Sequence, residues 1–142
     1  MTTPDTSPRG AALDAGSGNP PRRVLIVDDE VAMARAMNRA LRLAGFESLF
    51  ASSGLQVRSL LSTFKPAVLT LDIQMPWIDG MDVLQLLRDS PRNRPFKILM
   101  VSAAPRLERA LAAGADAVLA KPFTNEELVD AVLAQFGPLG EG

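Results

Sequence analysis

The chain has 142 residues, a formal net charge of −1 and a hydrophobic content of 47%, which is enough for one packed domain. It contains no cysteine and no histidine, which excludes disulfides, thiolate metal sites, imidazole catalysis and a phosphohistidine on this chain. The N-terminus lacks a basic-then-apolar signal pattern, and no apolar run approaches the roughly 18 residues of a membrane span. We therefore expect a soluble, cytoplasmic protein without membrane contact, and the near-neutral charge argues against direct nucleic-acid binding.

The first 21 residues differ in composition from the rest of the chain. They hold four prolines and three glycines with several Ser and Thr, which predicts a flexible tail. We expect one folded domain over residues 22–137 and a short C-terminal tail over 138–142. Because only six residues follow Phe136, we also expect that no output domain is appended.

Two strand-helix pairs are predicted in the first half of the chain. Apolar strands at 23–28 and 46–51 precede helical patterns at 30–44 and 53–64. Gly45 is expected to close the first helix, and Lys65-Pro66 ends the second. The inward face of the first helix is predicted to hold Val31, Met37, Leu41 and Ala44. Its outward face is predicted to hold Arg35, Asn38, Arg39 and Arg42.

The second half of the chain continues the alternation of strands and helices. Strands are predicted at 68–72, 96–101 and 115–119, and helices at 81–88, 105–113 and 124–136. Thr124 and Glu127 have the spacing of a capping box at the start of the last helix. Five short apolar strands joined by five helices predict an α/β fold, a doubly wound parallel sheet with strand order 2-1-3-4-5.

Polar residues follow or close four of the predicted strands. The acids Asp28-Asp29 follow the first strand and Asp72 ends the third, while Ser102 and Lys121 follow the fourth and fifth. Parallel strands would bring all of these to one edge of the sheet, where ligand sites gather in open α/β folds. Each residue also has a plain structural interpretation: a helix N-cap pair, a turn acid, a loop serine and a solvated lysine.

The ordered set of these motifs resembles the receiver domain of bacterial two-component response regulators, the CheY-like family with a flavodoxin-like fold. The likeness runs from about Arg23 to Phe136 and rests on Asp28-Asp29, Asp72, Met75-Pro76, Gly80, Ser102 and Lys121-Pro122.

Converging carboxylates repel one another, and a hard divalent cation such as Mg²⁺ offsets that repulsion best. The resemblance implies that Asp29, Asp72 and the backbone carbonyl of Gln74 ligate Mg²⁺, with Asp28 reaching it through water. It further implies that Asp72 is the phosphoacceptor, that Lys121 supplies a second positive charge, and that Ser102 binds a phosphoryl oxygen. Members of the family commonly have a cis bond at this Lys-Pro step.

The resemblance also implies a function and its partners. We expect a phosphoprotein that receives its phosphoryl group from a histidine kinase or a histidine phosphotransfer protein, and then acts on a downstream protein or in a phosphorelay. It would be no enzyme beyond its own phosphorylation and dephosphorylation. The face built from 105–113, 115–119 and 124–136 is the expected output face and a candidate homodimer contact. The arginine stripe of the first helix is most simply solvated, and its second interpretation is a docking surface for the phosphodonor.

Two features depart from the family pattern. Val118 stands where members often have Tyr or Phe, and the segment from Ser102 to Gly114 is shorter than usual by about one helical turn. Both fall on the expected output face. They leave open a second function, a constitutive interaction module with a receiver fold and an atypical output face.

A haloacid-dehalogenase-like phosphatase also uses a strand-end Asp, but Gln74 stands where that family usually has a second Asp.

Overall fold

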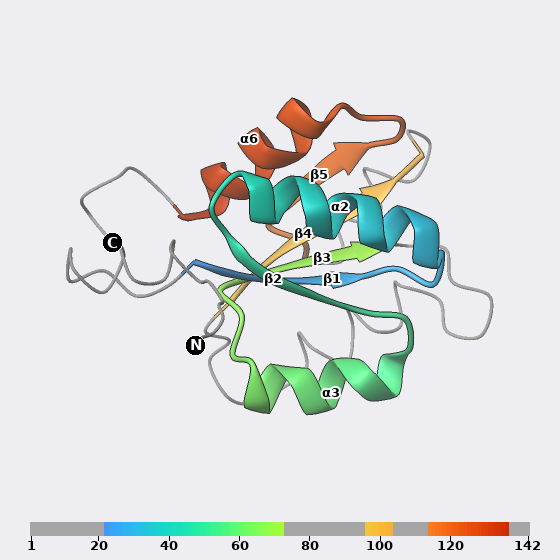
Figure 1. The fold of residues 1–142 in the computed structure, drawn as a ribbon, viewed down its shortest axis with the longest axis vertical. Coiled ribbons are helices and arrows are strands. Elements are labelled where there is room, and N and C mark those ends of the chain that lie inside the picture. Colours follow the sequence, from blue (N-terminus) through green and yellow to red (C-terminus); the bar gives the residue numbers. More distant parts are fainter. Residues whose placement is uncertain (1–21, 73–95, 104–113, 137–142) are drawn as a thin grey trace.

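The computed structural model describes residues 22–72, 96–103 and 114–136, and within them five strands and three helices (Figure 1). In chain order these are β1 (Arg23–Val27), α2 (Val31–Leu43), β2 (Glu47–Ala51), α3 (Gly54–Thr63), β3 (Val68–Asp72), β4 (Lys97–Ser102), β5 (Ala117–Ala120) and α6 (Asn125–Phe136). The predicted helices at 81–88 and 105–113 and both predicted tails lie outside the described residues.

The five strands form one parallel sheet in the order β2-β1-β3-β4-β5, which confirms the predicted topology. β3 is central, and all five of its residues are buried. It pairs with β1 on one side, where Leu25 lies opposite Leu69, and with β4 on the other, where Asp72 lies opposite Val101. Because every strand runs the same way, their carboxyl ends share one edge of the sheet.

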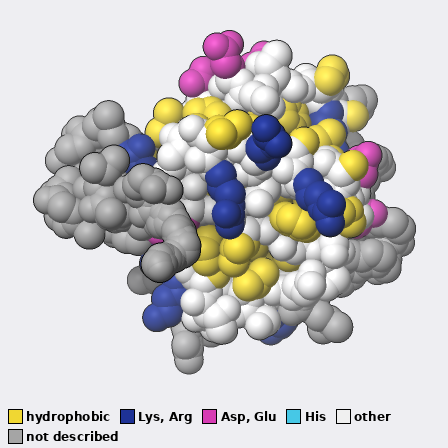
Figure 2. Space-filling model, viewed as in Figure 1, with side chains coloured by type: hydrophobic (Ala, Val, Ile, Leu, Met, Phe, Trp, Pro, Cys, Tyr) yellow, Lys and Arg dark blue, Asp and Glu magenta, His cyan; other side chains and the backbone are white. Residues whose placement is uncertain are grey.

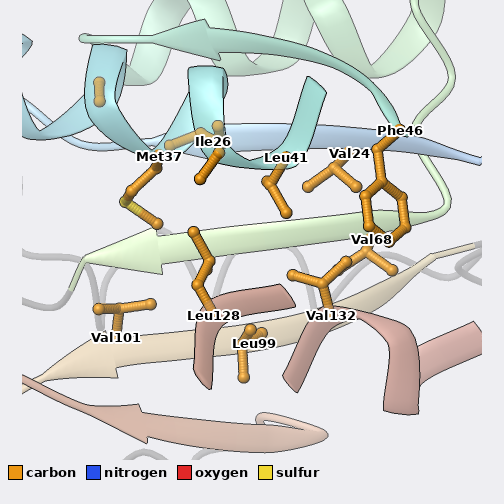
Figure 3. Close-up of a cluster of buried hydrophobic side chains, with 12 residues drawn as sticks. Val24, Ile26, Met37, Leu41, Phe46, Val68, Leu99, Val101, Leu128 and Val132 are labelled. Carbon is orange, nitrogen blue, oxygen red and sulfur yellow. The ribbon is translucent and has the colours of Figure 1, made fainter. Parts of the chain in front are cut away.

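Helices cover both faces of this sheet (Figure 1). On one face, α2 and α6 pack over a cluster that includes Ile26, Leu41, Leu99 and Leu128 (Figure 3). On the other face, Val57 of α3 packs with the alternate residues of the same strands, such as Leu69 and Met100 in the sheet centre. Successive strand side chains point to opposite faces, so a sheet covered on both sides favours strands that are near-continuous apolar runs.

Local signals fix the ends of the helices. Thr124 Oγ1 accepts from the Glu127 amide at 3.0 Å, and Glu127 Oε1 accepts from the Thr124 amide at 2.8 Å, which confirms the capping box. Gly45 has φ +102° and follows the last turn of α2. Its amide donates to the Arg42 carbonyl and the next amide, of Phe46, donates to the Leu41 carbonyl, both at 3.0 Å. This is the Schellman pattern, in which a glycine tolerates the positive φ.

The predicted faces of α2 need correction. Met37 and Leu41 are buried as expected, together with Ala34 and Ala40, but Val31 is 45% exposed and Ala44 is also exposed. Val31 and Ala44 lie at the two ends of the helix, whereas the buried side chains come from its middle turns.

Two residues of the predicted outward face of α2 also bond to the sheet. The Asn38 side chain accepts from the Ser48 hydroxyl, and the Arg42 guanidinium donates to the Ser48 carbonyl. Periodicity places a residue on a helix face, but it does not reveal a partner on a neighbouring strand.

Candidate functional site

The acidic pair Asp28-Asp29 lies directly beyond β1. The Asp28 amide donates to the Ala51 carbonyl at 3.1 Å, so the backbone continues the ladder with β2 for one more residue. Its carboxylate accepts from the amide of Glu30, the N-cap residue of α2, at 2.9 Å. The Asp28 side chain is therefore held between the strand end and the helix start, and it is only 2% exposed. Asp29 is half-buried beside it.

Asp72 is the last residue of β3 and completes an acidic triplet. Carboxylate oxygens of Asp28, Asp29 and Asp72 all lie within 4.8 Å of one another. Asp72 is buried as well, at 7% exposure. Oxygen ligands at this spacing suit a small hard cation, which would also offset the repulsion between the three carboxylates. The chemistry of the donor set thus fits the divalent ion that the sequence predicts.

Burial raises the pKa of Asp28 from 3.8 to about 6. The amide of Glu30 opposes this shift by stabilising the charged carboxylate, and so does the positive charge of Lys121. The negative charges of Asp72 and Asp29 add to the increase. The raised pKa is the direct consequence of placing a carboxylate in a buried, acid-rich site.

Lys121 brings the positive charge that the sequence predicts. It follows β5, and its amide donates to the Ser102 carbonyl at 2.9 Å, which joins the ends of β4 and β5. Its Nζ lies 3.5 Å from Asp72 Oδ2 and 4.0 Å from Asp28 Oδ2. The bond to Pro122 is cis, as the resemblance implies. One lysine therefore bridges two of the three acids.

Ser102, the last residue of β4, presents a buried hydroxyl. The residue is 2% exposed, and its Oγ has no hydrogen-bond partner in the part of the chain that the structure describes. A buried hydroxyl without a partner costs free energy relative to a paired one. A bound group with an acceptor oxygen would remove that cost, and this fits the predicted contact with a phosphoryl oxygen.

The structure thus gathers Asp28, Asp29, Asp72 and Lys121 and places Ser102 at the end of β4, the strand next to β3 in the sheet. Gln74, with its predicted carbonyl ligand, lies outside the described residues. Glu30, whose amide donates to the Asp28 carboxylate, was not predicted as a residue of the site. Its position at the start of a helix after two acids was the only available signal.

The comparisons with known proteins agree with this geometry. A family model described as the response regulator receiver domain matches residues 24–133, and the chain belongs to that family. It is 37% identical over 123 residues to the transcriptional regulatory protein PrrA of Mycobacterium leprae, an alignment that spans 86% of this chain and 52% of the relative. The chain therefore spans about half the length of the curated relatives it matches.

Solved structures show the same fold. The signal receiver domain of a response regulator from Bermanella marisrubri matches with a TM-score of 0.77 and 40% identity over 82% of this chain and 98% of that one. The chemotaxis protein CheY4 of Vibrio cholerae matches with a TM-score of 0.73 at 24% identity, over 81% and 98% of the two chains. In the described ranges, no helix has the length and apolar character needed to cross a membrane.

Proposed function

We propose that this chain is a phosphorylation-controlled receiver whose phosphoacceptor is Asp72. Receiver domains are phosphorylated by histidine kinases, so the proposed donor is a histidine kinase or a histidine phosphotransfer protein. One observation carries the proposal: a lysine ammonium, three carboxylates and a buried hydroxyl, which has no partner among the described residues, lie at the carboxyl ends of four strands. These residue types in these places support phosphoryl transfer to a carboxylate as the reaction of the site.

In the proposed reaction, a carboxylate oxygen of Asp72 attacks the phosphorus of the donor. The new O–P bond forms as the bond between phosphorus and the donor imidazole nitrogen breaks, and that nitrogen keeps the electron pair. Lys121 Nζ, already 3.5 Å from Asp72 Oδ2, stabilises negative charge on the transferred group. The product is an aspartyl phosphate on β3.

Mg²⁺ is the proposed cofactor, held by Asp29, Asp72 and the carbonyl of Gln74, with Asp28 acting through water. When bound, it supplies positive charge to the phosphoryl oxygens. The acidic triplet supports this assignment because Mg²⁺ takes oxygen ligands and is usually bound by one or two carboxylates together with phosphate oxygens and waters.

Ser102 is proposed to report the phosphoryl group to the rest of the domain. Its hydroxyl would donate to a phosphoryl oxygen and shift the end of β4, which the Lys121 amide joins to β5. The resulting population shift would alter binding of a downstream protein, or the chain would pass the phosphoryl group on in a phosphorelay. The domain would catalyse only its own phosphorylation and dephosphorylation.

One observation favours a second candidate, a constitutive interaction module. Val118 is half-buried on β5 and packs against the core cluster on the α3 face. A β-branched aliphatic side chain is stiff at χ1 and cannot swing inward as the Tyr or Phe common at this position would. Phosphorylation would then have no effect on partner binding. The predicted dimer contact stays a prediction.

The experiment is intact-mass spectrometry of the protein incubated with Mg²⁺ and a small phosphodonor such as acetyl phosphate. We expect a single phosphoryl adduct on the wild type, its absence when Mg²⁺ is chelated, and its absence in Asp72→Asn. Asp130→Asn, which changes an exposed acid on α6, is the matched control and should be phosphorylated normally. An adduct that persists in Asp72→Asn would remove the proposal, and turnover of a phosphomonoester would favour the phosphatase alternative.

A further inference from the structure

β2 forms one edge of the sheet, and Figure 1 looks onto this edge, with α2 above β2 and α3 below it. An edge strand presents unpaired backbone groups on its outer side, and these groups can pair with a strand of another molecule. The hydrogen bonds along β2 therefore show which contacts the edge can make.

Alternate residues of β2 point their backbone groups away from the sheet. The Glu47 amide donates to the Arg22 carbonyl at 3.0 Å, and the Ala51 carbonyl accepts from the Asp28 amide at 3.1 Å. Residues 47, 49 and 51 thus face β1, and the alternation of a strand directs the backbone groups of Ser48, Phe50 and Ser52 outward.

Side chains of the two flanking helices occupy two of these outward groups. Arg42 of α2 donates to the Ser48 carbonyl from Nη2 at 2.9 Å and from Nε at 3.2 Å. Gln56 of α3 accepts from the Ser52 amide through Oε1 at 2.9 Å. Between them, the backbone groups of Phe50 have no hydrogen-bond partner within the described ranges.

The two occupied groups are those that a symmetric dimer would use. If β2 paired antiparallel with β2 of a second copy about a twofold axis at Phe50, the two Phe50 residues would exchange both backbone bonds. Ser48 would then lie opposite Ser52 of the second copy, and its carbonyl would accept from that Ser52 amide. Within one molecule, Arg42 already donates to the Ser48 carbonyl and Gln56 already accepts from the Ser52 amide. Neither group is therefore free to form that bond between two copies.

We propose that Arg42 and Gln56 are edge guards that keep β2 from pairing with β2 of a second copy of this chain. The charge on this face acts in the same direction. Figure 2, in the same view, shows Lys and Arg side chains set among apolar ones, with acidic side chains nearer the rim. A twofold contact would bring the positive groups of two copies together, which is unfavourable.

The test is the oligomeric state of the full chain with both guards removed. Arg42→Met and Gln56→Met keep side-chain bulk while removing the donor and the acceptor. We expect the double variant to have twice the wild-type mass in light scattering at high protein concentration, and to gain amide exchange protection at Phe50. Arg39→Met, which changes an exposed arginine of the same helix, should stay at the wild-type mass.

Phosphorylation of Asp72 and the circular dichroism spectrum report that the double variant is folded. A folded double variant that stays monomeric at every concentration would overturn the proposal. The wild type provides a measurement that needs no variant, because the guarded Ser52 amide should exchange more slowly than the unguarded Phe50 amide. Equal or inverted exchange, or a wild-type dimer paired through β2, would also overturn the proposal.

Discussion

At the scale of single residues, the chemistry depends on how four charged groups share a small, partly buried site. Asp28 and Asp72 are almost fully covered, and Lys121 Nζ lies within 4.0 Å of a carboxylate oxygen of each. One lysine cannot neutralise three acids, so the metal-free site carries a net negative charge. That imbalance costs stability and favours binding of a cation and of a phosphoryl group coordinated to it.

The pKa of Asp28 leads to a prediction about stability and pH. Because its pKa is raised from 3.8 to about 6, its contribution to folding is fully present below pH 3.8 and is lost as the pH rises through 6. In the metal-free protein, Asp28→Asn should therefore be more stable than the wild type by up to about 3 kcal/mol above pH 7. That advantage should vanish near pH 4.

Urea unfolding of both proteins in chelator, at a series of pH values, measures this difference. The asparagine can still accept from the Glu30 amide, so the comparison isolates the charge. An advantage that does not change between pH 4 and 7.5 would contradict the prediction.

Substitution of Ser102 should affect the rate of phosphorylation and the stability of the fold in different ways. Ser102→Ala removes a buried group that has no partner in the described ranges, so the free energy of unfolding should be unchanged or higher by about 1 kcal/mol. Phosphorylation by acetyl phosphate should become slower, because the phosphoryl oxygen loses its donor. Ser102→Thr, which keeps a hydroxyl, is the matched control in a time course of adduct formation; equal rates for wild type and alanine variant would exclude the proposed contact.

At the scale of elements, most of the fold could be predicted because local and global signals agree. The strand interiors are mostly apolar, as a sheet covered on both faces favours. Gly45 and the Thr124–Glu127 pair mark helix ends by chemistry that acts within a few residues. The prediction was wrong for Val31 and Ala44, since periodicity cannot reveal where a helix extends beyond its contact with the sheet.

The capping box gives a prediction for α6. Thr124→Ala removes the acceptor of the Glu127 amide and should lower the free energy of unfolding by about 1 kcal/mol. Thr124→Ser retains the acceptor and should behave almost as the wild type in urea unfolding. A similar loss for both variants would indicate that the threonine methyl group, and not the cap, supports the helix.

At the scale of the whole molecule, the parallel sheet assembles the site from parts of the chain that are far apart in sequence. Asp28, Asp72 and Lys121 meet because β1, β3 and β5 end at one edge. This convergence could be predicted once parallel pairing was inferred. Two features could not be predicted: the burial of Ser102 without a partner in the described part of the chain, and the bond from Arg42 to Ser48. Both depend on side-chain packing that no sequence spacing encodes.

Cation binding should stabilise the whole domain. A ligand that binds only the folded chain and is present at 100 times its dissociation constant raises the free energy of unfolding by about 2.7 kcal/mol. Saturating Mg²⁺ should therefore raise the melting temperature of the wild type. Asp29→Asn should lose most of this increase, whereas Asp130→Asn should keep it. Melting curves with Mg²⁺ and with chelator measure the effect, and an equal increase in both variants would place the cation elsewhere.

Locating the phosphoryl group on the chain tests directly whether Asp72 is the phosphoacceptor. Borohydride reduces an acyl phosphate to the alcohol, so treating the phosphorylated protein and sequencing its peptides by mass spectrometry marks the modified acid. We predict conversion of Asp72 to homoserine, dependent on Mg²⁺ and on the phosphodonor. Conversion at Asp28 or Asp29 with Asp72 unmodified, or no conversion of any acid in fully folded protein, would show that Asp72 is not the phosphoacceptor.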